Sequence, residues 1–352
     1  MRVSWSPLLH LLLCLIATNV ATAAGADTTR LDIGLVVFDA GIPEDPTHNK
    51  DLGIFPRIRE AEARYLPFAL RQTLVDTNQW GPVRVLPDPD PGTELLITGR
   101  IIDSDGITLE VQVQAVDSRG VEWINQVYRE SSSEDDYQTQ RANGERPFQE
   151  LYDRVAADIY AVASQLSSAE IEKINQLSLL RYAVELAPAA FGSYYTRSEE
   201  GRYRLLRLPA HDDPMLERIK RVREQEYVFI DTVDEQYATL FSNMAPTYDL
   251  WRQYNREQSL YQDAHEERLA ERSKKRRGSY QAMKQIYNNY RWSKIQEQEA
   301  ARLATGFNNE VEPTIMRLQG RVIELEGSLE DQYREWRKIL HSIYLLETGA
   351  AG

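Results

Sequence analysis

The sequence ELLITGRIIDSDGITLEVQVQAVDSRGVEWINQVY, residues 94–128, decides the fold class. Its middle part alternates apolar and polar residues, and the apolar set is Ile107, Leu109, Val111, Val113 and Ala115. A period of two places one face of a strand on a core and the other in water. The segments DSDG (103–106) and DSRG (117–120) contain the Asp and Gly residues that tight turns prefer. Residues 94–128 are therefore predicted to form a three-stranded antiparallel meander.

The residues around the meander predict further strands and two helices. LDIGLVVF (31–38) is a short apolar run typical of a buried strand. Residues 57–77 have helical periodicity, and Pro67 is expected to kink this helix or to start a second one. Residues 83–86 form a short strand or only an extension, and a helix with an apolar face follows Pro147. The predicted order is β-α-β-β-β-β-α, or one strand fewer, in an α+β domain with trailing helices over residues 27–186.

The same segments carry a resemblance to known proteins. They are IGLVVF (33–38), LRQTLVDTNQWGPVRVLP (70–87), ELLITGRI (94–101), LEVQVQAVDSRGVEW (109–123) and FQELYDRVAADI (148–159). This amino-terminal half resembles the small periplasmic domains of the CsgG, TolB amino-terminal and penicillin-binding-protein-activator type. The resemblance implies a βαβ-type envelope module that works by protein contact, often in oligomers. CsgG-type channels are lipoproteins with amphipathic membrane hairpins, and this sequence has neither a lipobox nor such hairpins.

The first residues predict export. Arg2 precedes an apolar run over residues 8–16, and the small residues Ala21-Thr22-Ala23 form a cleavage site, so residues 1–23 are a predicted signal peptide. Cys14 is the one cysteine, and it lies inside the apolar run after Leu13, where a lipobox needs a small residue. The mature chain then has no disulfide, thiol nucleophile or Cys-ligated metal. A secreted chain of this size without cysteine fits the bacterial periplasm.

The charge balance excludes some partners. The chain has 41 Lys and Arg against 54 Asp and Glu, a net charge of −13, and removal of Arg2 makes it one unit more negative. Such acidity argues against nucleic acid as a partner and against general adsorption to anionic lipid. No second apolar stretch reaches the roughly 20 residues that a membrane-spanning helix needs.

The second half of the chain is predicted to be helical. Residues 187–214 contain three prolines and two glycines and read as a linker, with a short strand at 202–208. Residues 215–349 read as an all-α bundle or coiled coil, with a turn or kink at Ala245-Pro246. IMRLQGRVIELEGSLEDQYREWRKILHSIYLL (315–346) is interpreted as one long helix in which Gly320 and Gly327 allow close backbone approach. Its alternating spacing of three and four predicts a seam that binds another helix, of this chain or of a second one. The seam residues are Leu318, Val322, Leu325, Leu329, Gln332, Trp336, Ile339 and Ile343.

A group of aromatic residues is the second candidate site. Tyr248, Trp251, Tyr254 and Tyr261 recur at spacings that place several of them on one helix face. Such rings can stack on glycan, as a peptidoglycan-binding protein requires. The other interpretation is that they belong to the bundle core, because Tyr and Trp bury a large area and keep one polar group.

Other charged motifs have simpler explanations. The basic run RSKKRR (272–277) follows several glutamates, and pairing along a helix face accounts for much of it. His211-Asp212-Asp213 is the nearest approach to a metal-ligand cluster, but consecutive residues rarely face one ion, and the segment is interpreted as an acidic loop that caps the helix after Pro214. The sequence has none of the common nucleotide-binding, zinc or hydrolase motifs. We expect no catalytic residue, no metal and no cofactor.

These observations predict a non-enzymatic periplasmic protein. It would act through protein–protein contacts in the cell envelope, with another envelope protein or with itself as a homo-oligomer through the helical seam. Two alternatives stay open. The first is a protein that binds or modifies peptidoglycan with the Tyr/Trp-rich helices. The second is a secretion accessory protein, which only the resemblance implies.

Overall fold

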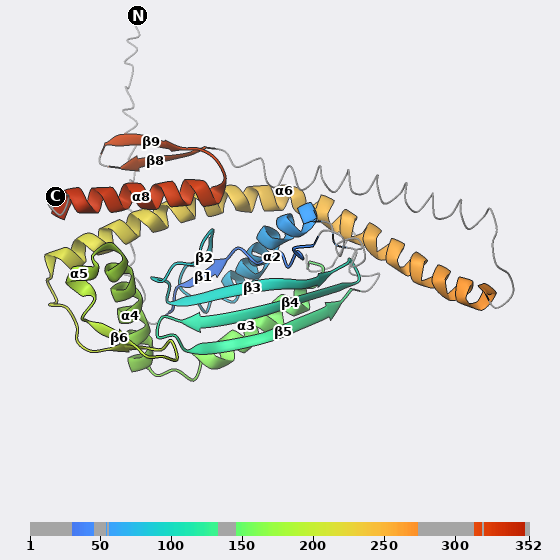
Figure 1. Cartoon of the computed structure of the whole chain (residues 1–352), viewed down its shortest axis with the longest axis horizontal. Helices are drawn as coiled ribbons and strands as arrows, with labels where there is room; N and C mark the ends of the chain where they lie inside the picture. The colour runs from blue at the N-terminus through green and yellow to red at the C-terminus, as the bar shows by residue number, and fades with distance from the viewer. Residues whose placement is uncertain are drawn as a thin grey trace, which may run out of the picture.

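The computed structural model of the chain describes residues 30–45, 54, 56–132, 146–273, 313–318 and 320–348. Its centre is a five-stranded sheet in the order β2-β1-β3-β4-β5 (Figure 1). The strands are β1 (Ile33–Val36), β2 (Val83–Leu86), β3 (Leu95–Ser104), β4 (Thr108–Asp117) and β5 (Glu122–Ser131). Strand β1 is parallel to both of its neighbours, and β3, β4 and β5 form the antiparallel meander. The predicted meander is confirmed, and residues 83–86 are a separate strand.

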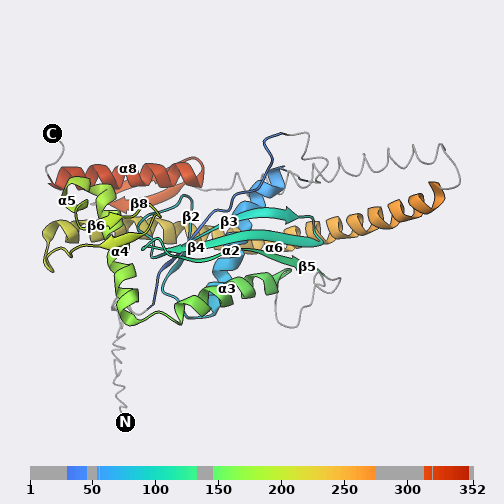
Figure 2. The same ribbon diagram turned by 60° about the horizontal axis from the view of Figure 1, so that its bottom comes forward.

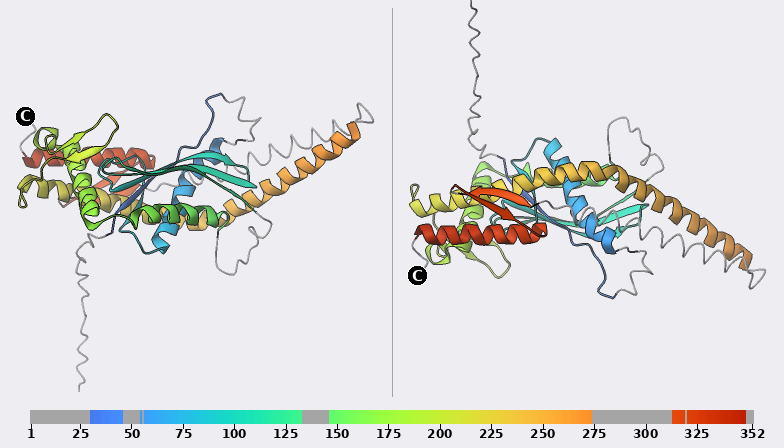
Figure 3. Two further views of the ribbon diagram at one scale, coloured as in Figure 1. Left: turned by 90° about the horizontal axis from the view of Figure 1, so that it is seen from below. Right: turned by 90° about the horizontal axis from the view of Figure 1, so that it is seen from above.

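Helices α2 (Pro56–Asp76) and α3 (Gln149–Ala163) lie on one face of this sheet (Figures 2 and 3). The strand register aligns Leu35 with Ile97 and Ile97 with Ala115, and all three side chains are buried. The apolar residues of the alternation over residues 107–116 thus lie on the face of the sheet that the helices cover. Helix α2 continues through Pro67, so no second helix starts there.

Ordered elements follow one another between α3 and Pro214, also within residues 187–214, the segment predicted to be a linker. Helix α4 (Ser168–Leu186) begins with a capping box, in which the Ser167 backbone N–H donates to the Glu170 carboxylate at 2.9 Å. A short helix α5 (Pro188–Phe191) and a hairpin of β6 (Tyr195–Arg197) and β7 (Tyr203–Leu205) follow. Phe191 is buried in the main core, so this segment packs on the body of the protein.

Helix α6 (Pro214–Ser273) is a continuous helix of 60 residues. At 1.5 Å per residue it is about 90 Å long. Of the turn or kink expected at Ala245-Pro246, the turn is absent, because the helix runs through both residues. Its first part lies beside the sheet and α4, and its last part extends beyond the sheet (Figures 1 and 3). Among the described residues, no helix combines the length and the hydrophobicity that a membrane span requires.

The prediction of one helix over residues 315–346 is wrong. The chain forms a hairpin of β8 (Thr314–Leu318) and β9 (Arg321–Leu325), followed by helix α8 (Leu329–Thr348). Gly320 in the hairpin turn has φ +77°, and Gly327 before α8 has φ +97°. These left-handed conformations favour glycine and end regular structure, so the two glycines separate elements and do not serve close helix packing. The coiled-coil seam as predicted is therefore split between a hairpin and a helix.

Helix α8 packs along the first half of α6 (Figure 1). Its buried residues are Leu329, Gln332, Tyr333, Trp336, Leu340 and Tyr344. The rings of Tyr333 and Trp336 each lie 6.1 Å from the Phe229 ring of α6. The helix-binding face of α8 is thus occupied by a helix of the same chain, and one continuous hydrophobic core joins the sheet, α4, α6 and α8.

Candidate functional site

The candidate site is the set of polar contacts that attach α6 to the body. We call residues 214–252 the inner part of α6 and residues 253–273 its outer part. The inner part crosses the edge strand β2, helix α2 and helix α8. Three buried polar clusters lie along it, centred on Glu62, Asp234 and Glu226.

The Glu62 cluster joins α2, β3 and the end of the inner part of α6. The Glu62 carboxylate accepts hydrogen bonds from the Ser104 hydroxyl at 2.7 Å, the Tyr248 hydroxyl at 2.6 Å and the Arg252 guanidinium at 2.9 Å. Glu62 is 0% exposed and Arg252 is 1% exposed. Arg59 places its Nε 3.6 Å from the other carboxylate oxygen. A buried carboxylate needs such partners, because removing a charge from water is costly.

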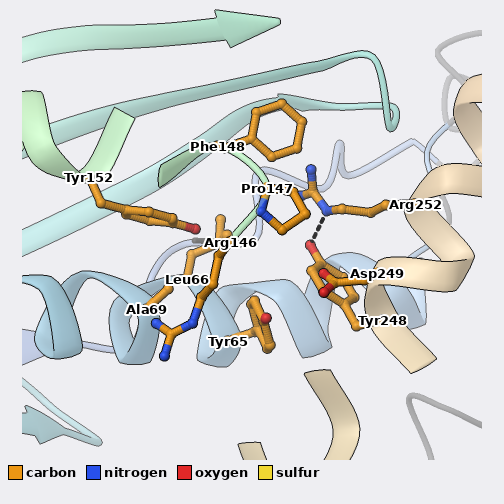
Figure 4. Close-up of a pocket in the computed structure, with 10 residues that line it drawn as sticks. All are labelled: Tyr65, Leu66, Ala69, Arg146, Pro147, Phe148, Tyr152, Tyr248, Asp249 and Arg252. Carbon is orange, nitrogen blue, oxygen red and sulfur yellow. Dashed lines mark hydrogen bonds between the residues drawn. The ribbon is translucent and has the colours of Figure 1, made fainter. Parts of the chain in front are cut away.

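A small hollow lies next to this cluster (Figure 4). It is lined by Tyr65, Leu66, Ala69, Arg146, Pro147, Phe148, Tyr152, Tyr248, Asp249 and Arg252. The Arg252 guanidinium lies 4.6 Å from the centre of the Phe148 ring and donates to the Tyr248 hydroxyl at 2.6 Å. The free space inside is large enough for about one water molecule. This hollow is too small for an organic substrate, and the Arg252 side chain in its lining is already used to hold α6.

The Asp234 cluster covers the open edge of β2. The Val85 backbone N–H, which has no further strand beside it, donates to the Asp234 carboxylate at 3.4 Å. The Arg71 Nε of α2 lies 3.3 Å from the same carboxylate. Burial raises the pKa of Asp234 to about 7, against the opposing charge of Arg71. One turn before, Asp231 binds Arg84 of β2 at 2.6 Å. Helix α6 therefore protects an edge strand that would otherwise be free to pair with another chain.

The Glu226 cluster joins α6 to α4 and α8. The Glu226 carboxylate accepts hydrogen bonds from the Tyr182 hydroxyl of α4 at 2.7 Å and from the Tyr333 hydroxyl of α8 at 2.5 Å. The Arg337 Nε of α8 lies 3.3 Å from it. Burial raises the pKa of Glu226 to about 7, and the nearby charge of Asp90 acts in the same direction. This single carboxylate connects three helices.

A fourth carboxylate, Glu94, lies where β1 and β3 begin. It accepts a hydrogen bond from the Asp32 backbone N–H at 2.7 Å, and burial raises its pKa to about 7. Arg223 of α6 contributes an opposing positive charge and donates to the Gly92 carbonyl oxygen at 2.8 Å. Burial thus raises the pKa of three carboxylates, those of Glu94, Asp234 and Glu226.

The chemistry of these clusters suits attachment. Their carboxylates contact arginines, tyrosine hydroxyls or backbone N–H groups of other elements, so their binding capacity serves to hold those elements together. In the part of the chain that the structure describes, no group of three or more His, Cys, Asp or Glu side chains is arranged to hold a metal ion. The outcome is a long helix whose inner part is tightly fixed.

The predicted seam residues lie in two different environments. Leu318, Val322 and Leu325 belong to the hairpin, where Leu325 is buried and Val322 is exposed. On α8, Leu329, Gln332 and Trp336 are buried, while Ile339 and Ile343 are half-buried. The buried face is completed by Leu340 and Tyr344, one position away from the predicted residues.

The aromatic stripe is described only at Tyr248. This ring packs 4.3 Å from the Tyr65 ring, and its hydroxyl donates to Glu62. It therefore faces the body of the protein. The side chains of Trp251, Tyr254 and Tyr261 lie outside the described part of α6.

The two charged motifs also differ in how far the structure describes them. The Asp213 carboxylate accepts hydrogen bonds from the backbone N–H groups of Met215 at 2.9 Å and Leu216 at 3.4 Å, so the predicted capping role is confirmed. Of the basic run 272–277, residues 274–277 lie outside the described residues.

Sequence reasoning missed the buried carboxylates, although one signal was present. Ile219, Val222, Glu226, Phe229 and Val233 follow one another at spacings of three and four, so Glu226 interrupts an apolar helix face. A carboxylate in such a row must have buried partners. The partners themselves are 44 and 107 residues away in the chain, so the pattern does not identify them.

Comparison with known proteins finds little. No protein-family model matches the chain, and no curated protein matches it. One solved structure that resembles it is a dodecamer of a PelC point variant from Paraburkholderia phytofirmans, with 14% sequence identity and a TM-score of 0.20. The match covers 41% of this chain and 92% of the PelC chain.

Proposed function

We propose that the protein is a non-enzymatic periplasmic protein that assembles with another envelope protein, or with a second copy of itself, through the outer part of α6. The observation that carries this proposal is the 60-residue helix α6, which is fixed to the body over its inner part and extends past the sheet over its outer part (Figures 1 and 3). A helix held in this way presents its outer part to a partner at a fixed angle.

The three clusters support this role because they make the inner part rigid. The pair Glu62–Arg252 lies at the point where α6 leaves the body, and it is almost completely buried. A partner bound at the outer part would therefore contact a helix whose inner part is fixed to the body. A protein that works by contact needs such an anchor, since ordering a loose segment on binding costs affinity.

The periplasmic location rests on the sequence. Residues 1–23 have the composition of a signal peptide, and the mature chain has no cysteine. The predicted seam on α8 does not offer a surface to a second protein, because Leu329 and Trp336 are buried against the chain's own core. This moves the proposed contact from α8 to the outer part of α6.

Site-specific photo-cross-linking in intact cells tests the proposal. A photoreactive residue at Leu260 of the outer part is compared with one at Val75 near the end of α2, since these side chains are 44% and 43% exposed. We expect adducts of discrete mass from position 260 and none from position 75. An adduct of twice the chain mass identifies a second copy, and another mass identifies a different protein. The same adducts at both positions, or none at 260, would contradict the proposal.

The other two functions have less support. The wall-binding function depends on an open aromatic surface, and Tyr248 is turned toward Glu62 and Tyr65. The secretion function depends on the family resemblance alone. Neither is favoured by an observation of its own.

A further inference from the structure

The segment YYTRSEEGRYRLLRLPA, residues 194–210, differs in charge from the rest of the chain. It contains four arginines and two glutamates, in a protein whose net charge is −13. The two glutamates are adjacent in the hairpin turn between β6 and β7. Positive charge is thus concentrated in one short segment of an acidic protein.

The hairpin has an inner and an outer face. Tyr195 is paired with Leu205, and both pack against the core beside α4. On the opposite face Thr196 is paired with Arg204, and both are exposed. The chain then continues through Leu206 and Leu208, which are 53% and 52% exposed. We call the exposed residues of this strand and its continuation the Arg–Leu surface: Arg202, Arg204, Leu206, Arg207 and Leu208.

The arginines of this segment are not neutralised. Within the residues that the structure describes, no carboxylate oxygen lies within 4.0 Å of a guanidinium nitrogen of Arg197, Arg202, Arg204 or Arg207. Arg207 lies over the Tyr194 ring at 4.5 Å and donates to the Ser193 hydroxyl. These contacts keep its charge unpaired while they orient it. Elsewhere in the chain, arginines such as Arg84 and Arg252 do bind carboxylates.

We infer that the Arg–Leu surface docks on a membrane that contains anionic phospholipid. Arginines near such a membrane are attracted to its negative surface potential, and exposed leucines gain from burial at the acyl boundary. A soluble acidic polymer would explain the arginines but not the two leucines between and beside them. The inference is independent of the proposed contact at α6.

The negative charge of the whole protein does not oppose this docking at physiological salt. The Debye length there is about 8 Å, so a membrane responds to the charges nearest to it. The hairpin lies beside α4 and α5 at one end of the molecule, and the outer part of α6 extends from the other end (Figure 1). Docking through the hairpin would therefore leave the outer part of α6 pointing away from the membrane.

Vesicle binding tests the inference. The mature chain is mixed with vesicles of phosphatidylglycerol and phosphatidylethanolamine, and separately with vesicles of phosphatidylcholine, and the bound fraction is measured by sedimentation. We expect binding to the anionic vesicles only, with an affinity that falls as salt increases. The double variant R202Q/R204Q should bind about 25-fold more weakly, since each arginine near the surface contributes about five-fold. L206S/L208S should bind about tenfold more weakly, through the loss of apolar burial.

Matched controls separate this surface from general charge. R100Q/R129Q removes two exposed arginines from the sheet, and Val322→Ser removes an exposed aliphatic side chain from the other hairpin. Both should bind as the unaltered protein does, and all variants should unfold at the same temperature. No binding to anionic vesicles, or equal binding by R202Q/R204Q, would overturn the inference. Equal binding by L206S/L208S, together with equally tight binding of polyglutamate, would replace the lipid by an acidic polymer.

Discussion

Substitution of Arg252 by Met should strongly destabilise the protein. The change keeps most of the side-chain stem but removes the guanidinium bonds to Glu62 at 2.9 Å, to Ser104 at 2.8 Å and to Tyr248 at 2.6 Å. Glu62 then remains as a fully buried carboxylate. Breaking a buried pair in this way costs about 3–5 kcal/mol. The lower end applies here, because Arg59 remains 3.6 Å from Glu62.

The free energy of unfolding in urea measures this effect, and two further variants test its cause. E62Q/R252M removes the buried carboxylate charge but keeps an oxygen that accepts from Ser104 and Tyr248, and Arg59 keeps Asp103 at 3.7 Å, so it should recover about 1 kcal/mol relative to R252M. Arg221→Met changes an exposed arginine on the same helix and should cost less than about 0.5 kcal/mol. The reasoning is refuted if R252M unfolds like the Arg221 control, or if E62Q/R252M is no more stable than R252M.

Three further predictions concern pH, α8 and the hairpin. Glu94, Asp234 and Glu226 have a pKa of about 7 in the folded protein. In the unfolded chain the same carboxyl groups release their protons at the lower, ordinary pKa of Asp and Glu. The folded state thus binds more protons between about pH 5 and pH 7, so urea midpoints should fall as pH rises through this range and E94Q should flatten the profile. Leu340→Ala should lower the free energy of unfolding in urea by about 2–5 kcal/mol and Ile339→Ala by about 1 kcal/mol, because only Leu340 is buried. Equal losses would mean that Ile339 contributes to the core as much as Leu340 does, as the predicted seam requires. Gly320→Ala should destabilise by about 1 kcal/mol in thermal unfolding because of its positive φ, whereas a helix would be stabilised by a similar amount.

The sheet was predictable because its signals are local. The alternation over residues 107–116 and the two Asp- and Gly-containing turns define strands and their connections within a few residues of sequence. The burial of Leu109, Val111 and Val113 follows directly from that alternation. The parallel pairing of β1 with β2 and β3 involves residues about 50 to 60 positions apart, and no local pattern shows it; only the βαβ-type module that the resemblance implies contains such a pairing.

The C-terminal segment was misinterpreted because two periodicities overlap there. Leu318, Val322 and Leu325 fit a helical spacing of three and four, while Met316, Leu318, Ile323 and Leu325 fit the alternation of a hairpin. The decisive signal was Gly320 between two apolar runs, which marks a turn. A glycine at this position fits a turn better than close helix packing, so the contact surface predicted for one long helix does not form.

The attachment of α6 could be predicted only in part. Glu226 interrupts an apolar row, and that row indicates a buried carboxylate, but the tyrosines that bind it come from α4 and α8. Glu62 and Arg252 are 190 residues apart, and each looks like an ordinary charged residue of a helix. Partners of this kind are set by tertiary packing and leave little trace in local sequence.

Cysteine accessibility at Leu260 tests the central claim most directly. Cys14 is the one cysteine of the sequence, so in a protein without residues 1–23 a single Leu260→Cys or Val75→Cys substitution gives one labelling site on the outer part of α6 or on α2. The maleimide labelling rate of each is measured in intact envelopes and in the purified protein. The account predicts that the thiol at position 260 is protected in envelopes and labelled quickly after purification, while position 75 reacts equally in both. Equal labelling of position 260 in envelopes and in the purified protein would contradict a partner at the outer part of α6.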